Sequence, residues 1–285
     1  AGHYVKLNPF FEKEGISMGD FIPATVTGYA EWPKNTPNYW ALPAYADVVG
    51  WTYRKDWFSE PELQAEFKEK YGRDLGVPKT LEELKDIATF FQGREIDGKT
   101  VYGAAIYTER GSEGITMGVT NALYNYGFKY ENPDKPYDLQ GYVNSKGAVA
   151  GLEFYKALYD CCTPPGSSDW YMSEDIDAYK SGQVALQMNF AFIWPGVNAD
   201  PNVGGDKSGY FANPAGPDGH FAQLGGQGIS VVSYSEHQDA ALEYIKWFAQ
   251  PDIQAKWTAA GGASAMRSGT SPKNGCTSAR MPFSS

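Results

Sequence analysis

The segment TLEELKDIATFFQGREIDGKTVYGAAI, residues 80–106, decides the fold class because it predicts a helix followed directly by a strand. Thr80 is followed three residues later by Glu83, a spacing typical of a capping box at a helix N-terminus. One face of the helix is predicted to be buried, since apolar residues recur at helical spacing: Leu84, Ile87, Ala88 and Phe91. The apolar run 101–106 then predicts a buried strand.

Similar patterns alternate along the rest of the chain. Ser145 is predicted to cap a helix with one apolar face: Val149, Leu152, Tyr155, Leu158 and Tyr159. Further helices are predicted over 235–248 and from Pro251 to the glycines at 261–262. Further strands are predicted over 48–53, 183–188 and 229–232. Strands interleaved with helices indicate an α/β protein with a mostly parallel sheet.

The composition excludes several functional classes. The chain has 285 residues, 34 acidic against 24 basic side chains, and a formal net charge of −10. Nucleic acids and anionic membranes are bound by basic surfaces, so neither is an expected partner. The 42% of hydrophobic residues can form a core in one large domain or two smaller ones. The sequence begins at Ala1 without a signal-peptide pattern, so we expect either a removed signal or a start inside a longer protein.

Residues 93–100, GREIDGKT, match the phosphate-loop pattern G-x-x-x-x-G-K-[ST] letter by letter. A phosphate loop follows a strand and begins a helix, so that backbone N–H groups face the phosphates. Here the order is reversed, and Glu95 and Asp97 would lie where phosphates bind. A surface turn is therefore the preferred interpretation.

Other catalytic and metal-binding patterns are weak. The chain has an odd number of cysteines: Cys161, Cys162 and Cys276. A bond between adjacent Cys161 and Cys162 would close a very strained ring, so a disulfide scaffold is not expected. The redox state of the three cysteines stays open. The three histidines are far apart in sequence, and no zinc motif or nucleophile elbow is present, so neither a metal site nor a cofactor is expected. Paired carboxylates of a glycoside hydrolase remain an alternative, since several acids lie near aromatics: Asp47, Glu109, Asp169 and Asp175.

Aromatic residues give the strongest local signal. They are dense over residues 39–58, at Trp170 with Tyr171, and over 190–194. Most are expected in the core. Those at the ends of strands could instead stack on sugars, whose sites combine flat aromatic rings with planar polar side chains.

These residues carry a family resemblance. The run YWALPAYAD, residues 39–47, followed by WTYRKDWF, residues 51–58, resembles a sequence block of the extracellular sugar-binding proteins of ABC transporters, the family-1, maltose-binding-protein-like type. Further blocks resemble the same family in the same order: 78–84, 179–186, 224–229, 240–248 and 261–267. Members normally have further βα units before the part that matches residues 2–7 and further helices after Arg267. We therefore expect this chain to be incomplete at both ends.

The resemblance implies a two-lobed α/β fold of the type II periplasmic-binding-protein kind, with crossing hinge strands between lobes that close over the ligand. The expected first lobe comprises residues 1–106 and 232–261, and the second comprises 107–231 and 262–267. Crossings are expected near 103–106, 228–232 and 262–267. Residues 268–285 are expected to be a tail that is either disordered or foreign to the natural protein.

The matching blocks and the chemistry of sugar sites together suggest ligand contacts. Tyr45 would provide an aromatic wall and Asp47 an acceptor for two hydroxyls. Donors, stacking rings and close backbone approaches are expected from the remaining candidates: Arg110, Gly111, Trp170, Asn189, Trp194, Gly225, Gly226, Gln227 and Arg267.

The resemblance implies a non-enzymatic, monomeric protein, periplasmic or extracellular, that binds a sugar, polyol or sugar derivative and delivers it to the membrane permease subunits of an ABC importer. Two alternatives stay open. One is a glycoside hydrolase with Asp47 and Asp175 as its acid pair, and the other is a sugar-sensing receptor module.

Overall fold

The computed structural model describes residues 2–267, so the predicted tail at 268–285 lies outside the described residues. The chain forms two compact units. The terminal unit comprises residues up to 47 together with those from 224 onward, and the central unit comprises residues 48–223. These bounds differ from the expected lobes 1–106 with 232–261 and 107–231 with 262–267.

The difference has a physical reason. Residues 48–106 pair and pack with the segment that follows them, because the strand at 99–105 is hydrogen-bonded to the strand at 184–190. Residues 262–267 belong with the terminal unit, where Ser264 bridges to Tyr45 and Met266 to Phe21. The chain therefore changes unit at 47/48 and 223/224 rather than near 103–106, 228–232 or 262–267.

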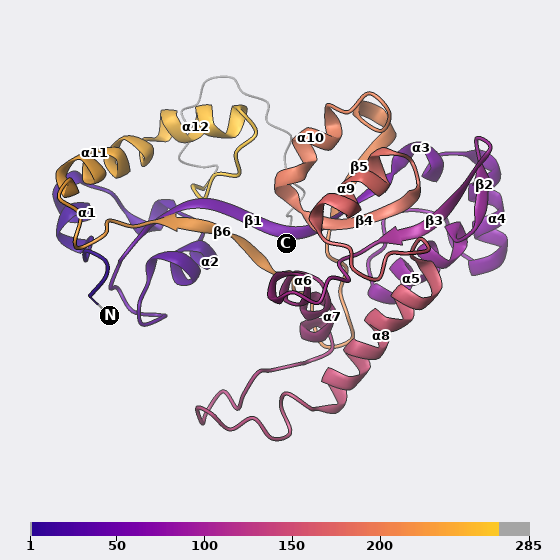
Figure 1. The fold of residues 1–285 in the computed structure, drawn as a ribbon, viewed down its shortest axis with the longest axis horizontal. Coiled ribbons are helices and arrows are strands. Elements are labelled where there is room, and N and C mark those ends of the chain that lie inside the picture. Colours follow the sequence, from indigo (N-terminus) through magenta and orange to yellow (C-terminus); the bar gives the residue numbers. More distant parts are fainter. Residues whose placement is uncertain (1, 268–285) are drawn as a thin grey trace. The chain divides into compact units, whose positions relative to one another are not determined.

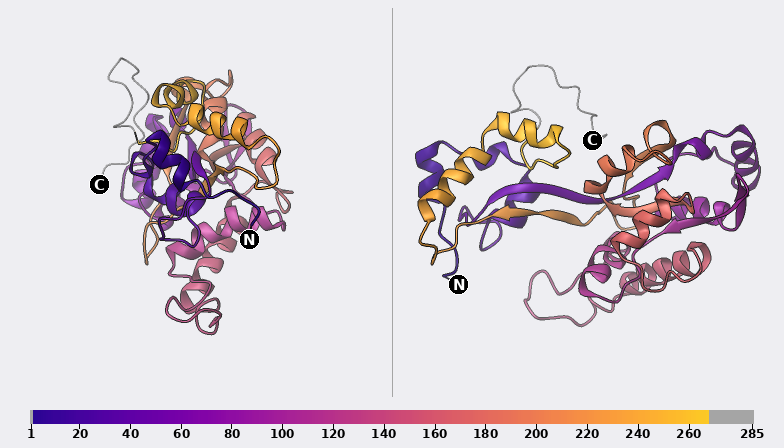
Figure 2. Two further views of the ribbon diagram at one scale, coloured as in Figure 1. Left: turned by 90° about the vertical axis from the view of Figure 1, so that its left-hand side faces the viewer. Right: turned by 45° about the horizontal axis from the view of Figure 1, so that its top comes forward.

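The terminal unit contains the two ends of the described chain. Figure 2 shows strand β6 beside the first half of β1, and helices α11 and α12 follow β6 in sequence. Its elements are α1 (Asn8–Glu14), the short 3₁₀ turn Met18–Asp20, α2 (Pro23–Thr25), the π-helical turn Val26–Ala30, the start of β1 (Leu42–Arg54), β6 (Leu224–Ile229), α11 (Gln238–Phe248) and α12 (Pro251–Ala259). Its core joins residues from both ends of the sequence: Leu7, Phe11, Phe21, Leu42, Val231, Ile245 and Phe248.

The central unit is built around β-strands in the order β2-β3-β4-β1-β5 (Figure 1). Its strands besides β1 are β2 (Arg94–Ile96), β3 (Lys99–Ala105), β4 (Val184–Phe190) and β5 (Ser208–Ala212). Its α-helices are α3 (Lys55–Phe58), α4 (Pro61–Tyr71), α5 (Leu81–Phe91), α6 (Ser112–Met117), α7 (Val119–Asn125), α8 (Lys146–Cys162), α9 (Met172–Lys180) and α10 (Trp194–Asn198). Short 3₁₀ turns occupy Ala191–Ile193 and Gly205–Lys207.

The prediction of a mostly parallel sheet is wrong. β3 and β4 are parallel, whereas β4 and β5 both run antiparallel to β1, and β2 runs antiparallel to β3. The connection from β3 to β4 passes through α6 to α9, which is long enough for a parallel crossover. β2 and β3 are joined by only two residues, which permits only a hairpin.

That hairpin contains the phosphate-loop pattern. Asp97 and Gly98 form its two-residue turn, both with positive φ, at 52° and 73°. This backbone is that of a type I′ hairpin turn, for which Asp-Gly is a preferred pair. Strand residues lie on both sides of the turn, so the surface-turn interpretation is confirmed and the turn leads into β3 rather than into a helix.

The predicted helices are mostly confirmed. Thr80 caps α5 by accepting a hydrogen bond from the Glu83 N–H at 3.2 Å. The capping box is incomplete, since the Glu83 carboxylate accepts from Lys79 N–H at 2.6 Å and not from the cap residue. Ser145 caps α8 through the Ala148 N–H at 3.0 Å.

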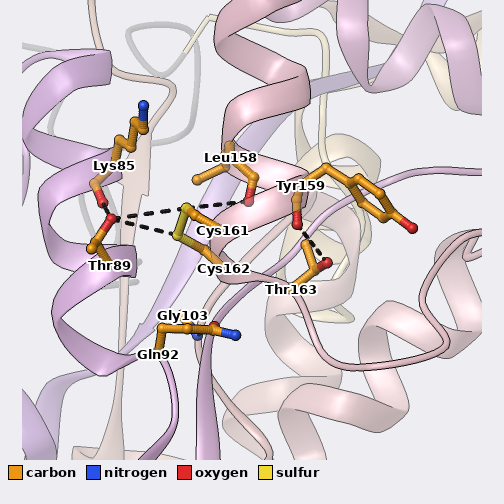
Figure 3. The surroundings of a disulfide bond; sticks show 9 residues. All are labelled: Lys85, Thr89, Gln92, Gly103, Leu158, Tyr159, Cys161, Cys162 and Thr163. Atoms are coloured by element: carbon orange, nitrogen blue, oxygen red, sulfur yellow. Dashed lines mark hydrogen bonds between the residues drawn. A yellow bond between two sulfur atoms is a disulfide. The ribbon is translucent and has the colours of Figure 1, made fainter.

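Details of three elements differ from expectation. On α8, Val149 and Leu152 are exposed, whereas the expected Leu158 is buried together with Ala148, Gly151 and Cys162. α11 begins at Gln238 rather than at 235, and β6 ends where the strand 229–232 was expected to begin. Cys161 and Cys162 are joined by a disulfide at the end of α8 (Figure 3). The sequence had left the redox state of these two cysteines open.

Replacing the α5 cap is expected to destabilise the protein. Thr80→Ala removes the acceptor for the Glu83 N–H, so the free energy of unfolding should fall by about 1 kcal/mol. Thr258→Ala is the matched control, because the Thr258 hydroxyl only donates to the Gln254 carbonyl within α12. Urea unfolding of both variants measures the difference, and equal stabilities would contradict a capping role for Thr80.

Candidate ligand-binding site

In the terminal unit, two tyrosines lie near a buried carboxylate. Asp47, on β1, is 5% exposed. Burial and, secondly, the Asp47 charge raise the pKa of Tyr29 and of Tyr45 to about 12 each. Both phenols are therefore neutral hydroxyls at physiological pH. A carboxylate that accepts hydrogen bonds beside two neutral hydroxyls suits an uncharged polyhydroxyl ligand.

Strand β6 approaches this cluster through its glycines. The Tyr29 hydroxyl donates to the carbonyl of Gly225. Gly226 has a φ of 103°, and a Cβ at this position would collide with the carbonyl oxygen of Tyr45. Only glycine allows β6 to lie this close to β1. The structure thus brings the predicted residues Gly225, Gly226 and Gln227 next to Tyr45.

The predicted residue Arg267 lies at the end of the described chain. Its backbone N–H donates to the carbonyl of Asp20 at 2.8 Å. Trp257 was missed by the sequence analysis. Its ring makes an edge contact with Tyr45 at 6.3 Å between centroids, and it is 38% exposed. Tyr29 was missed as well, since nothing in its local sequence indicates contact with β6 almost 200 residues later.

In the central unit, polar groups meet at the carboxyl ends of the parallel strands β3 and β4. Tyr107, just beyond β3, donates its hydroxyl to Asn189 Oδ1 on β4 at 2.6 Å. The same oxygen accepts from the Phe190 N–H at 2.8 Å. Asn189 is 1% exposed, and its amide nitrogen has no hydrogen-bond partner among the described residues. Asn189 therefore has only donor capacity left.

Backbone hydrogen bonds place Trp170 beside the segment that follows β3. The Trp170 carbonyl accepts from the N–H groups of Thr108 and Glu109, both at 2.9 Å, and its own N–H donates to the Thr108 hydroxyl at 2.8 Å. The predicted residues Arg110 and Gly111 follow directly. Gly111 caps α6, and a Cβ there would lie 2.5 Å from the Glu109 carboxylate.

Two predicted aromatic regions have clear packing roles. The Trp194 ring lies 5.0 Å from that of Tyr210, and a Cβ on Gly50 would lie 2.8 Å from it. The aromatic run 51–58 contributes Trp51, Trp57 and Phe58 to the central core, as the core interpretation expected. Trp194 thus covers the glycine of β1 as well as being a candidate for stacking.

A groove of about 520 Å³ lies elsewhere in the central unit, between α4, α5, α7 and α8. It shares no residue with the predicted site: its lining is Tyr71, Glu82, Lys85, Asp86, Thr89, Tyr126, Ala150, Glu153, Phe154 and Ala157. Within residues 2–267, no group of three or more potential ligands could hold a metal ion. No helix in this range has the length and hydropathy required to cross a membrane.

The fold is that of known binding proteins. A family model described as "Bacterial extracellular solute-binding protein" matches residues 1–255, so the chain belongs to this family. The family is one of solute-binding proteins, which are typically non-enzymatic.

Solved structures give the same result at the level of the fold. An ABC transporter solute-binding protein from Agrobacterium radiobacter K84, in complex with ribitol, has a TM-score of 0.74 at 23% identity and covers 93% of this chain. The maltose-bound T. maritima MalE3 has a TM-score of 0.71 at 24% identity, also over 93%. A solute-binding protein from Thermotoga lettingae TMO, bound with α-D-tagatose, has a TM-score of 0.73 at 20% identity and covers 93% of this chain. The predicted α/β, two-lobed binding-protein fold is confirmed.

The chain spans only 62% to 63% of these three structures' own chains.

Proposed function

We propose that this chain binds a sugar or polyol and presents it to the permease subunits of an ABC importer. The observation that carries the proposal is the buried Asp47 carboxylate with two neutral tyrosine hydroxyls nearby. The family supports it, as do the ribitol, maltose and tagatose bound by the similar proteins. In this role the protein works as a monomer outside the cytoplasm.

Each unit contains proposed ligand contacts. The terminal unit contributes Tyr45, Asp47, Gly225, Gly226, Gln227 and Arg267, together with the newly recognised Tyr29 and Trp257. The central unit contributes Arg110, Gly111, Trp170, Asn189 and Trp194. Charge-assisted hydrogen bonds from sugar hydroxyls to Asp47 would supply much of the affinity.

Asp175 is unsuitable as one of the two catalytic acids of the glycoside hydrolase alternative. Asp175 lies in α9 and is fully buried, and burial and then the charge of Glu174 raise the pKa of its carboxyl well above the ordinary value. A carboxyl without exposed atoms cannot protonate a glycosidic oxygen. A sensory receptor would use the same contacts as a transport protein, so this alternative concerns the partner rather than the site.

The test is calorimetric titration of the 285-residue chain with ribitol, D-mannitol, tagatose and maltose, with an amino acid as the unrelated ligand. Asp47→Ala should raise the Kd for the bound sugar roughly 10- to 150-fold, corresponding to the loss of a hydrogen-bonded charge. Asp47→Asn keeps the shape and checks that any loss is not caused by misfolding. Asp239→Asn is the matched control, because Asp239 is an exposed carboxylate of the same unit. An unchanged Kd in Asp47→Ala would remove Asp47 from the site, and no binding of any sugar or polyol would overturn the proposed function.

A further inference from the structure

The disulfide between Cys161 and Cys162 ends helix α8 and touches the neighbouring helix (Figure 3). Cys162 is fully buried in the central core, whereas Cys161 is partly exposed. The Thr89 hydroxyl of α5 lies 3.8 Å from Cys161 Sγ and 3.5 Å from Cys162 Sγ. It also donates to the Lys85 carbonyl at 2.7 Å. The disulfide thus joins a fully buried cysteine to a partly exposed one where α8 meets α5.

A chain of hydrogen bonds leads from this disulfide to the candidate site. Thr163, directly after Cys162, donates to the Tyr159 carbonyl at 3.0 Å and accepts from the Ser167 hydroxyl at 2.9 Å. The Ser167 carbonyl accepts from the Thr108 hydroxyl, which in turn accepts from the Trp170 N–H at 2.8 Å.

The last links reach the predicted ligand residues. The Trp170 carbonyl holds the N–H groups of Thr108 and Glu109, immediately before Arg110 and Gly111. The segment 163–170 therefore connects the end of α8 to both predicted contact regions after β3. Ser167 is 2% exposed, so a change at the end of α8 has little free space to absorb it.

We propose that Cys161 and Cys162 form a thiol–disulfide exchange site whose redox state changes the ligand affinity of the candidate site. The second half of this proposal rests on the proposed function. The co-reactant is a dithiol. Its thiolate attacks Sγ of the partly exposed Cys161, forming a mixed disulfide and releasing Cys162 as a thiolate, which takes up a proton. The second thiol of the reductant then displaces Cys161, so the protein gains two electrons and two protons and the reductant leaves as its own disulfide.

Reduction should loosen the connection to the site. Two unbonded sulfur atoms need more room than a bonded pair, and Cys162 is fully buried in the central core. We therefore expect that reduction displaces Cys161 and the residues after α8, beginning with Thr163. We expect the reduced protein to bind its ligand at least about fivefold more weakly, at the lower end of typical couplings between sites.

The experiment compares the oxidised protein with protein treated with dithiothreitol and then desalted anaerobically, both in a Cys276→Ser background. Mass spectrometry after alkylation counts free thiols, and amide hydrogen exchange is followed over 163–171 and 107–111. Titration with ribitol and with maltose gives the affinities. Reduction should expose two thiols, speed exchange severalfold in both segments and raise the Kd, and reoxidation should reverse all three.

Two variants separate the causes. Cys161→Ser with Cys162→Ser should match the reduced protein and no longer respond to the reductant. Ser167→Ala interrupts the hydrogen-bond chain, so its disulfide should still form while its affinity no longer depends on redox state.

Several results would overturn the proposal. Two alkylated cysteines without reductant would show that the disulfide does not exist in solution. If reduction left the amide hydrogen exchange rates of 163–171 and 107–111 unchanged, the coupling between the disulfide and the candidate site would be refuted, whatever the ligand. Sugar binding with the same Kd in both states would refute it while leaving the proposed function intact, whereas faster exchange without binding of either sugar would count against the proposed function alone.

Discussion

Gly226→Ala is expected to lower the free energy of unfolding by about 3 kcal/mol or more. Gly226 has a φ of 103°, which L side chains rarely adopt, and the added methyl group would collide with the Tyr45 carbonyl. The obstacle is backbone, which cannot rotate away as a side chain could, so β6 must move from β1. Tyr45 and Gly225 are both proposed ligand contacts beside Gly226. Ligand affinity should therefore fall together with stability.

Two glycine controls separate the causes of this effect. Gly15 also has a positive φ, of 67°, but a Cβ there would meet nothing within 4 Å. Gly15→Ala should therefore lose only about 1–2 kcal/mol from backbone strain. Gly76 has neither the positive φ nor a nearby atom, so Gly76→Ala should be close to neutral. Chemical unfolding of the three variants measures the series, and a Gly226→Ala protein as stable as Gly15→Ala would disprove the close approach of the two strands.

Asp175→Asn is expected to change how stability depends on pH. Burial raises the pKa of the Asp175 carboxyl well above the ordinary value of 3.8, with the Glu174 charge as a secondary cause. Neither carboxyl oxygen has a hydrogen-bond partner among the described residues. The folded protein thus keeps a proton that the unfolded chain releases above pH 3.8.

The direction of the pH effect follows from this difference in bound protons. Between pH 3.8 and the raised pKa of the folded state, the wild type should lose about 1.4 kcal/mol per pH unit relative to Asp175→Asn. Below that pH range the difference in free energy of unfolding between the two proteins should be constant. Tyr155, the nearby group whose raised pKa also reflects the Asp175 charge, stays neutral throughout this range.

Asp177→Asn is the matched control, since Asp177 is an exposed carboxylate of the same helix. Its stability should follow that of the wild type at every pH. Urea unfolding from about pH 4 to about pH 8 provides the comparison. Parallel curves for the wild type and Asp175→Asn would show that the Asp175 carboxyl is ionised and partnered in the folded protein.

Local patterns in the sequence predicted local structure well. Thr80 and Ser145 act as helix caps because a capping hydroxyl bonds to an N–H only three residues away. The Asp97-Gly98 turn follows from the preference of these residues for positive φ. The strand directions were mispredicted because β1 pairs with strands more than 130 residues later, and no local spacing determines such a pairing.

The candidate site shows the same limit. Asp47 and Tyr45 were identified by family blocks, but Tyr29 and Tyr107 were not. The hydroxyl of each tyrosine donates a hydrogen bond to a distant segment, from Tyr29 to Gly225 and from Tyr107 to Asn189. An isolated tyrosine in a sequence does not indicate which strand end its hydroxyl will meet.

The order of the two units along the chain has a consequence for biosynthesis. The core of the terminal unit needs Leu7 and Phe11 from its first segment and Ile245 and Phe248 from its last. The ribosome makes residues 48–223 between them, which takes on the order of 10–35 s at ordinary elongation rates. During this interval Leu7 and Phe11 lack their partners Ile245 and Phe248, while the central unit is continuous and can fold as soon as it emerges. Among the described residues, segment 2–47 therefore depends for its packing on residues made after the whole central unit.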